Sequence, residues 1–211
     1  QIHEGYMFTD TGFWDTFRSL FGLLALVYPD QASKIQEGLV NTYLQSGFLP
    51  EWASPGHRNC MIGTNSASVV AEAWLKGIRG YDIDVLWEAV CHGAHNVHPD
   101  CPSTGRLGWE YYDRLGYVPC DVGINESAAR TLEYSYNDWC IWKLGKALGK
   151  SQEAIAPYGK AAFNYKNLYR PEFSLMSGRK AEGDFSDNFN QYKWGGDFTE
   201  GNALQYTWSV F

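Results

Sequence analysis

The glutamate Glu200 stands in a segment that combines a carboxyl group with glycine, amide and aromatic side chains. Within residues 198–208 it is followed by Gly201 and Asn202 and then by aromatic rings. A carboxyl group among apolar rings keeps its proton more readily near neutral pH, which is what a general acid for glycoside cleavage needs. The alternative is a carboxylate at the start of a helix, where the helix dipole stabilises the anion. Asn202 adds an amide that can bind sugar hydroxyls.

A second combination, in residues 12–18, suits the binding of a sugar. The ring of Trp14 can stack on the apolar face of a pyranose, and Asp15 can accept hydrogen bonds from two adjacent hydroxyls. Arg18 follows one helical turn later, where it can orient Asp15. The alternative is an aspartate that caps a helix beside aromatic residues of the core.

Two further clusters carry carboxylate and amide groups. Glu133 and Asn137 share one face of a long predicted helix, and Tyr134 and Asp138 share another, so one acidic face can line a pocket. Exposed carboxylates beside buried rings are the alternative. The other cluster is the irregular segment 52–65, which ends at the amide side chain of Asn65.

The same irregular segment contains His57, which we interpret as structural. The sequence places no carboxylate beside it, as an acyl-transfer triad would require.

The composition favours one globular domain over residues 1–211. Aromatic residues make up 16% of the chain, with nine Trp and fourteen Tyr. Such a content fits either a well-filled helical core or the handling of carbohydrate. The formal net charge of −7 argues against a nucleic-acid partner, and the apolar stretch 20–28 is too short to span a bilayer.

The five cysteines show no spacing typical of a zinc site, so the sequence predicts no metal site built on sulfur. A Cys91–Cys101 bridge can form in an oxidising compartment, but we favour isolated buried thiols.

Helical spacing of apolar residues predicts an all-α domain built from helical hairpins. A loop over about 169–198, with room for a small hairpin, is unusually long for a compact domain unless it serves a site. The chain stops at Phe211 where a helix is expected to continue, which we interpret as a truncation. Helices are expected over about 15–27, 31–45 with a cap at Gly47, 67 to near 77–80, 83–92 with Asp82 as N-cap, 108–115, 125–148, 151–168 with Ser151 as N-cap, and from 202.

An ordered series of motifs resembles glycoside hydrolase family 92 over nearly the whole chain. The resemblance is specific because the motifs occur in one order. They are FWDTFRSL, GFLPEW, CMIG followed by ASVVAEAWLKGI, GYVP, TLEYSYNDWCI, ALGK, NYKNLY and FTEGNALQYTW.

This resemblance implies a calcium-dependent enzyme that removes terminal α-linked mannose from glycans with inversion. It implies part of an (α/α)6-type helical domain beside an N-terminal β-sandwich, in a secreted or periplasmic bacterial protein. Glu200 matches the family's general acid, and Asp15 matches a residue that holds the terminal mannose. Asn65 stands where many members have His, in another part of the sugar site.

The resemblance also implies that the catalytic base and the calcium ligands lie beyond Phe211, so no metal ligand is expected within this chain. In an inverting enzyme the base activates a water ~6.5–9.5 Å from the acid. Two alternatives remain open. One is another helical-barrel glycosidase of the α-glucosidase or trehalase type, and the other is a helical module that binds carbohydrate without cleaving it.

Overall fold

A computed structural model describes residues 4–209 of the chain. The structure is mainly helical, with three small two-stranded antiparallel sheets. The helices are α1 (Phe13–Thr16), α2 (Leu20–Val27), α3 (Pro29–Ser46), α4 (Ser66–Leu75), α5 (Ile83–Ala94), α6 (Trp109–Leu115), α7 (Ser127–Ala147), α8 (Gln152–Ala161), the 3-10 helix η1 (Asn164–Leu168) and α9 (Ala203–Tyr206). The strands are β1 (Thr11–Gly12), β2 (Trp52–Ala53), β3 (Val97–His98), β4 (Cys101–Gly105), β5 (Tyr169–Arg170) and β6 (Leu175–Met176).

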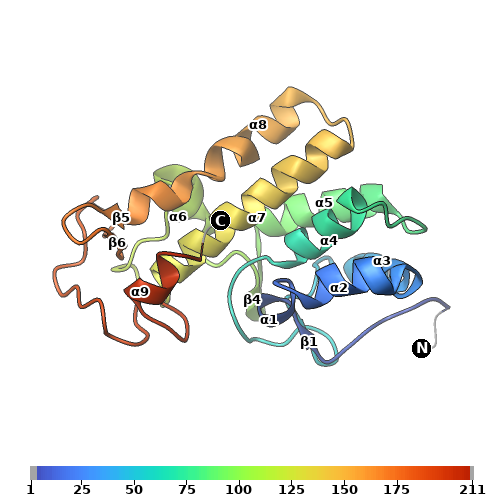
Figure 1. Ribbon diagram of the computed structural model, residues 1–211, viewed down its shortest axis with the longest axis horizontal. Coiled ribbons are helices and arrows are strands. Elements are labelled where there is room, and N and C mark those ends of the chain that lie inside the picture. Colours follow the sequence, from blue (N-terminus) through green and yellow to red (C-terminus); the bar gives the residue numbers. More distant parts are fainter. Residues whose placement is uncertain (1–3, 210–211) are drawn as a thin grey trace.

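Helix α7 runs through the middle of the molecule, and α8 returns antiparallel along it (Figure 1). On its other sides α7 packs against α4 and α5, while α2 and α3 lie beyond these two helices. The β5–β6 hairpin and α9 lie at the opposite end of the molecule from α3 (Figure 1). Helix α7 therefore connects the end of the molecule that contains α3 to the end that contains the β5–β6 hairpin and α9.

Both main hydrophobic clusters depend on α7. Ile141 and Leu144 belong to the larger cluster, which also takes residues from α3, α4 and α5. Leu132 belongs to the second cluster, together with Phe198 and Tyr206 from the end of the chain. A helix that supplies two cores is buried nearly all round, which explains the broad apolar coverage of its sequence.

The expected order of helices is confirmed, and three predicted caps are present. Gly47 ends α3 in the left-handed conformation, with φ of 78°. The Asp82 side chain accepts hydrogen bonds from the backbone of Asp84 and Val85 at the start of α5. The Ser151 hydroxyl accepts one from Ala154 N at the start of α8.

Two predicted helices are each divided in the structure. The helix expected over 15–27 is interrupted between α1 and α2, and the interruption contains Arg18, whose side chain reaches across to Glu133 on α7. The helix expected over 151–168 ends as α8 and continues as η1, where Asn167 Nδ2 donates to Gly116 O at 3.0 Å. In both places a contact with a distant part of the chain competes with regular helix.

The predicted helical domain is confirmed, and short strands that the sequence analysis did not place also pair across loops. Strands β1 and β2 pair antiparallel, with Gly12 opposite Trp52. A Cβ atom built on Gly12 would lie only 2.4 Å from the Trp52 ring, so this pairing requires glycine. The predicted hairpin in the long loop is present as β5 and β6, which pair antiparallel.

All five cysteines are free thiols, so the structure has no Cys91–Cys101 bridge. Between residues 4 and 209, no helix is long and apolar enough to cross a membrane.

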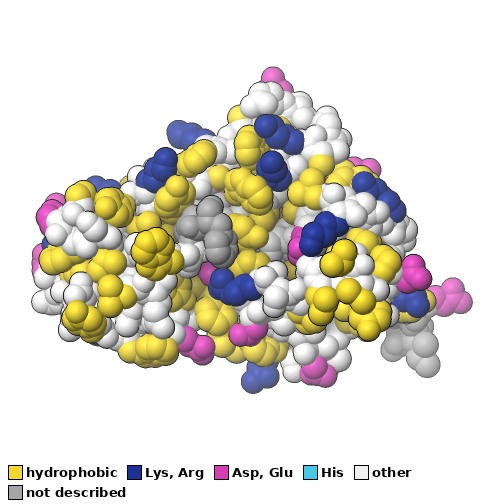
Figure 2. All heavy atoms as spheres, in the orientation of Figure 1, with side chains coloured by type: hydrophobic (Ala, Val, Ile, Leu, Met, Phe, Trp, Pro, Cys, Tyr) yellow, Lys and Arg dark blue, Asp and Glu magenta, His cyan; other side chains and the backbone are white. Residues whose placement is uncertain are grey.

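A hydrophobic surface remains uncovered on α2 and around it. Large apolar side chains gather over this helix on the face shown in Figure 2. Leu23 is 53% exposed and Leu26 is 80% exposed. A contiguous exposed apolar surface of this kind is typical of a contact with further protein.

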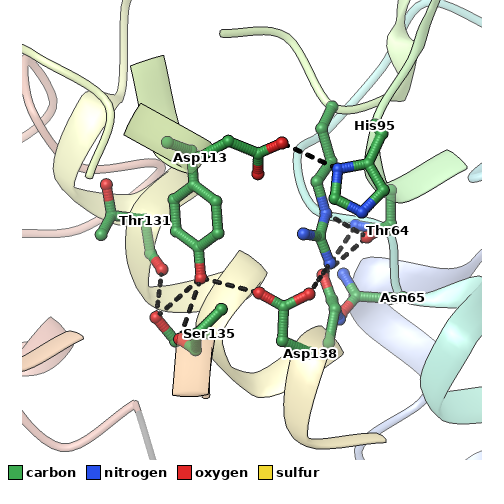
Figure 3. Close-up of polar contacts among 11 residues, drawn as sticks. Thr64, Asn65, His95, Asp113, Thr131, Ser135 and Asp138 are labelled. Carbon is green, nitrogen blue, oxygen red and sulfur yellow. Dashed lines mark hydrogen bonds and ion pairs between the residues drawn. The ribbon is translucent and has the colours of Figure 1, made fainter. Parts of the chain in front are cut away.

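A buried ion pair lies at the centre of a polar network that joins α6 and α7 (Figure 3). Arg106 Nη2 lies 2.7 Å from Asp138 Oδ1, and the two side chains are only 1% and 2% exposed. Arg106 Nε also donates to Thr64 Oγ1, and the Tyr112 hydroxyl donates to Asp138 Oδ2. Asp138 therefore stabilises the interior and is not the exposed carboxylate that the sequence left open.

Candidate active site

Segments far apart in the sequence meet beside the first half of α7. Trp14 comes from α1, Asn65 precedes α4, Glu133 lies on α7, and Tyr206 ends α9. Trp14 packs against the cluster that contains Leu132 and Tyr206. Three of the side chains predicted to bind substrate, those of Trp14, Arg18 and Glu133, are thus brought together.

Glu133 is buried and paired with a cation from the α1–α2 connection. Its side chain is 5% exposed, and Oε1 lies 3.2 Å from Arg18 Nη2. The Arg18 guanidinium also lies over the Trp14 ring, 5.3 Å from its centroid. The cation–π contact with Trp14 and the ion pair with Glu133 therefore both hold the Arg18 side chain in place. The prediction that Arg18 orients Asp15 is replaced by this pairing with Glu133.

The protonation of Glu133 depends on two opposing influences. Burial raises the pKa of its carboxyl group, whereas the charge of Arg18 and the amide of Asn65 lower it. The indole N–H of Trp14 lowers this pKa as well. The net direction is upward, so Arg18 offsets only part of the cost of burying this carboxylate.

The Asn65 side chain makes its hydrogen bonds inside the protein. It is fully buried, its Nδ2 donates to Ile62 O, and its Oδ1 accepts from Asn137 Nδ2 at 3.0 Å. Gly63 brings this segment against α7, because a Cβ there would lie 2.6 Å from Asn65 Nδ2 and 3.2 Å from Glu133 Cβ. The predicted shared face of Glu133 and Asn137 is confirmed, and both contact the segment that ends at Asn65.

Asp15 and Glu200 are both exposed, unlike Glu133. Asp15 lies on α1 next to Trp14, where a ligand can reach its carboxylate. Glu200 lies in the loop before α9 and adopts a left-handed backbone, with φ of 48°. The aromatic enclosure expected around Glu200 is not formed by residues 4–209, because Phe198 and Tyr206 pack into the core and Trp208 is 79% exposed.

Asn202 begins helix α9 as its N-cap. Its side chain accepts from Gln205 N, and the Gln205 side chain in turn accepts from Asn202 N, which completes a capping box. The helix therefore starts at Ala203, three residues after Glu200, and Glu200 is not part of its first turn. Asn202 thus fixes the loop that carries the carboxylate.

His57 contacts Ser46 through Nε2 at 2.8 Å, and its ring lies 5.2 Å from that of His98. Among the described residues, no hydrogen bond or ion pair joins it to a carboxylate, in keeping with a structural role. Across positions 4–209, no group of three or more His, Cys, Asp or Glu side chains could hold a metal ion.

The sequence did not point to Glu51 or Tyr206 as important. Glu51 is buried, and its two carboxylate oxygens accept from the backbone N–H and the hydroxyl of Ser66 at the start of α4. The only sequence signal for Glu51 was a charged residue within the apolar motif GFLPEW. Tyr206 was seen as one aromatic residue among several, although its hydroxyl contacts Thr199 O.

Burial raises the pKa of Glu51 from an ordinary 4.5 to about 8, against the hydrogen bonds of Ser66 and Asn65 and the charge of Arg106. The folded chain thus holds a proton that the unfolded chain releases, so stability falls as the pH rises from 4.5 to 8. We expect Glu51→Gln to remove a slope of up to about 1.4 kcal/mol per pH unit. Urea unfolding across this interval measures it. Glu4→Gln, at an exposed site, serves as the control, and an unchanged slope in Glu51→Gln would contradict the assignment.

The sequence model of the glycosyl hydrolase family 92 catalytic domain matches residues 1–211. The chain belongs to this family. A family GH92 inverting mannosidase of Bacteroides thetaiotaomicron, BT2199, superposes with a TM-score of 0.96 at 48% identity, covering 100% of this chain and 28% of that one. The GH92 α-mannosidase BT3965 of the same organism, solved with mannoimidazole, gives 0.89 at 33% identity, with the same two coverages.

A protein called a secreted glycosidase, from Arthroderma benhamiae, is 33% identical over 169 residues, which are 74% of this chain and 22% of its own length. The chain thus spans about a quarter of the length of these GH92 relatives. It corresponds to part of the catalytic domain of a glycoside hydrolase.

Proposed function

We propose that this GH92 segment belongs to an enzyme that removes terminal α-linked mannose from glycans with inversion, and that Glu200 is its general acid. The observation that carries the proposal is the meeting of Trp14, Arg18 and Glu133 beside the chain segment that presents Glu200. The similarity to GH92 mannosidases at 48% and 33% identity supports mannose as the sugar.

Different exposed groups bind the sugar and protonate the leaving group. Trp14 gives an apolar surface for one face of the mannose ring, and Asp15 accepts hydrogen bonds from adjacent hydroxyls. Glu133 keeps Arg18 over the Trp14 ring, so the charged side chain is held in one position before the sugar arrives. Asn65 supports this site from within the protein, through its hydrogen bond with Asn137, and the half-buried Asn202 supports it by capping α9.

Cleavage by inversion needs two carboxyl groups. Glu200 gives its proton to the oxygen of the leaving group, and a second carboxylate takes a proton from the attacking water on the opposite face of the sugar. We place that base, and the calcium ligands, in parts of the enzyme other than these 211 residues. Calcium, when bound, would supply positive charge near the sugar.

The Glu200 side chain is exposed in this structure, so further protein can close over it. We propose that additional helices pack on the exposed apolar surface of α2, complete an (α/α)6-type barrel, and enclose the loop before α9. The small share of the GH92 relatives that this chain spans supports such a completion, which we extend to an N-terminal β-sandwich. A secreted or periplasmic location is part of the proposal, supported by the secreted relative.

The decisive experiment compares sugars on the intact enzyme that contains this segment. We expect hydrolysis of an aryl α-mannoside in the presence of calcium, and proton NMR should show β-mannose as the first product. Release of glucose from an α-glucoside or trehalose, with no release of mannose, would favour the other helical-barrel glycosidases. Glycan binding without any hydrolysis would favour a binding module.

The isolated 211 residues provide a control in the same assay. We expect no turnover from them, because the base is absent and Glu200 is open to solvent. Turnover that disappears in Glu200→Gln would show instead that this segment contains a complete catalytic pair.

A further inference from the structure

The backbone around Glu200 is held in an unfavourable conformation by contacts on either side. A non-glycine residue with φ of 48° is strained, so neighbouring contacts must maintain it. On one side Gly195 N donates to Gly201 O at 2.9 Å. On the other, the hydroxyl of Tyr206 donates to Thr199 O.

Tyr206 touches both neighbours of Glu200. Besides its bond to Thr199 O, its ring lies so close to Gly201 that a Cβ there would be 2.9 Å from Cε2. The ring also packs against Phe198, with centroids 5.3 Å apart, and it is only 7% exposed. One rigid, buried side chain therefore fixes the carbonyl before Glu200 and the α-carbon after it.

Tyr206 also belongs to the hydrophobic cluster against which Trp14 packs. Burial raises the pKa of its hydroxyl, and the negative charge of Glu133 raises it further. The phenol thus stays protonated and remains a donor over the whole working pH range. Through the shared hydrophobic cluster, the loop of Glu200 is held in a fixed relation to Trp14, one of the sugar-binding residues.

We propose that Tyr206 is a positioning residue that aims the carboxyl group of Glu200 at the leaving-group oxygen. The inference rests on the proposed role of Glu200 as general acid. Tyr206 itself touches neither the sugar nor the transferred proton. It acts through the Thr199 carbonyl and through the space it denies to residue 201.

The test is Tyr206→Phe in the intact enzyme, measured with α-mannosides whose leaving groups differ in basicity. For a poor leaving group such as an alkyl alcohol, a misplaced acid should lower kcat by about 10- to 100-fold. For dinitrophenolate, which needs no proton to depart, the loss should stay below about threefold. A purely structural role would lower both rates by the same factor.

Tyr117→Phe is a matched control, because its buried hydroxyl also donates to a loop carbonyl, that of Lys180, at 3.0 Å. We expect it to lower the rates with all leaving groups equally. Should Tyr206→Phe fold poorly, Gly201→Ala tests the same positioning role, since its new Cβ must displace the Tyr206 ring. It should show the same dependence on the leaving group.

Glu200→Gln separates failure of the inference from failure of the proposed function. If Glu200→Gln loses activity mainly on poor leaving groups while Tyr206→Phe behaves like Tyr117→Phe, the positioning role is wrong and the acid stands. If Glu200→Gln itself shows no dependence on the leaving group, the assignment of the acid is wrong, and the role of Tyr206 is overturned with it.

Discussion

Glu200→Gln in the intact enzyme is expected to lower kcat for an unactivated α-mannoside by about 10²- to 10⁴-fold, the usual contribution of a positioned acid. Glutamine keeps the size of the side chain but cannot give a proton to the leaving oxygen. Glutamine has the same size, and the Glu200 side chain is exposed among residues 4–209, so folding should be unchanged. Initial rates with a mannose disaccharide, together with a thermal unfolding curve, measure both effects.

Glu182→Gln gives a matched comparison, because it neutralises another exposed glutamate in the same long loop. It should leave kcat within about twofold of the original value, since it provides no proton to the reaction. Equal losses in the two variants would show that loop charge, and not proton transfer from Glu200, governs the rate.

Arg106→Met is expected to have the largest effect on stability. It removes the cation that lies 2.7 Å from Asp138 Oδ1 where both side chains are almost fully buried. A buried charge left without its partner costs about 3–5 kcal/mol in the free energy of unfolding. The Tyr112 hydroxyl still donates to Asp138, but one neutral donor offsets only part of that loss. Urea unfolding at neutral pH measures the change.

Two comparisons identify the cause of this loss. Lys150→Met breaks a pair at 2.9 Å in which Asp84 is 79% exposed, so it should cost less than about 1 kcal/mol. The double variant Arg106→Met with Asp138→Asn removes both charges and should be more stable than Arg106→Met alone. A double variant less stable than the single one would indicate that packing, and not an unpaired charge, explains the effect.

The helices were predictable where local chemistry decides them. The caps at Gly47, Asp82 and Ser151 were predicted from single residues beside an apolar repeat. The interruption at Arg18 was not predictable in this way, because its partner Glu133 lies 115 positions away. Strands β1 and β2, of two residues each, were missed as well, since alternation cannot be recognised over so short a length.

The candidate site shows a similar division. Helical spacing correctly placed Glu133 and Asn137 on one face, but it could not show that this face is buried against Asn65. Arg18 was assigned to Asp15 because both lie within one turn, and the structure pairs it instead with a residue on another helix. Local spacing identifies neighbours along a helix, whereas ion pairing between helices depends on packing.

The contact between Gly12 and Trp52 has a consequence for the variation of this family over evolutionary time. The Trp52 ring fills the space that a side chain at position 12 would need, with three ring atoms between 2.4 and 2.7 Å from an ideal Cβ. The two positions are therefore expected to change together. An aligned set of homologues should show alanine or serine at position 12 only where position 52 holds a smaller residue.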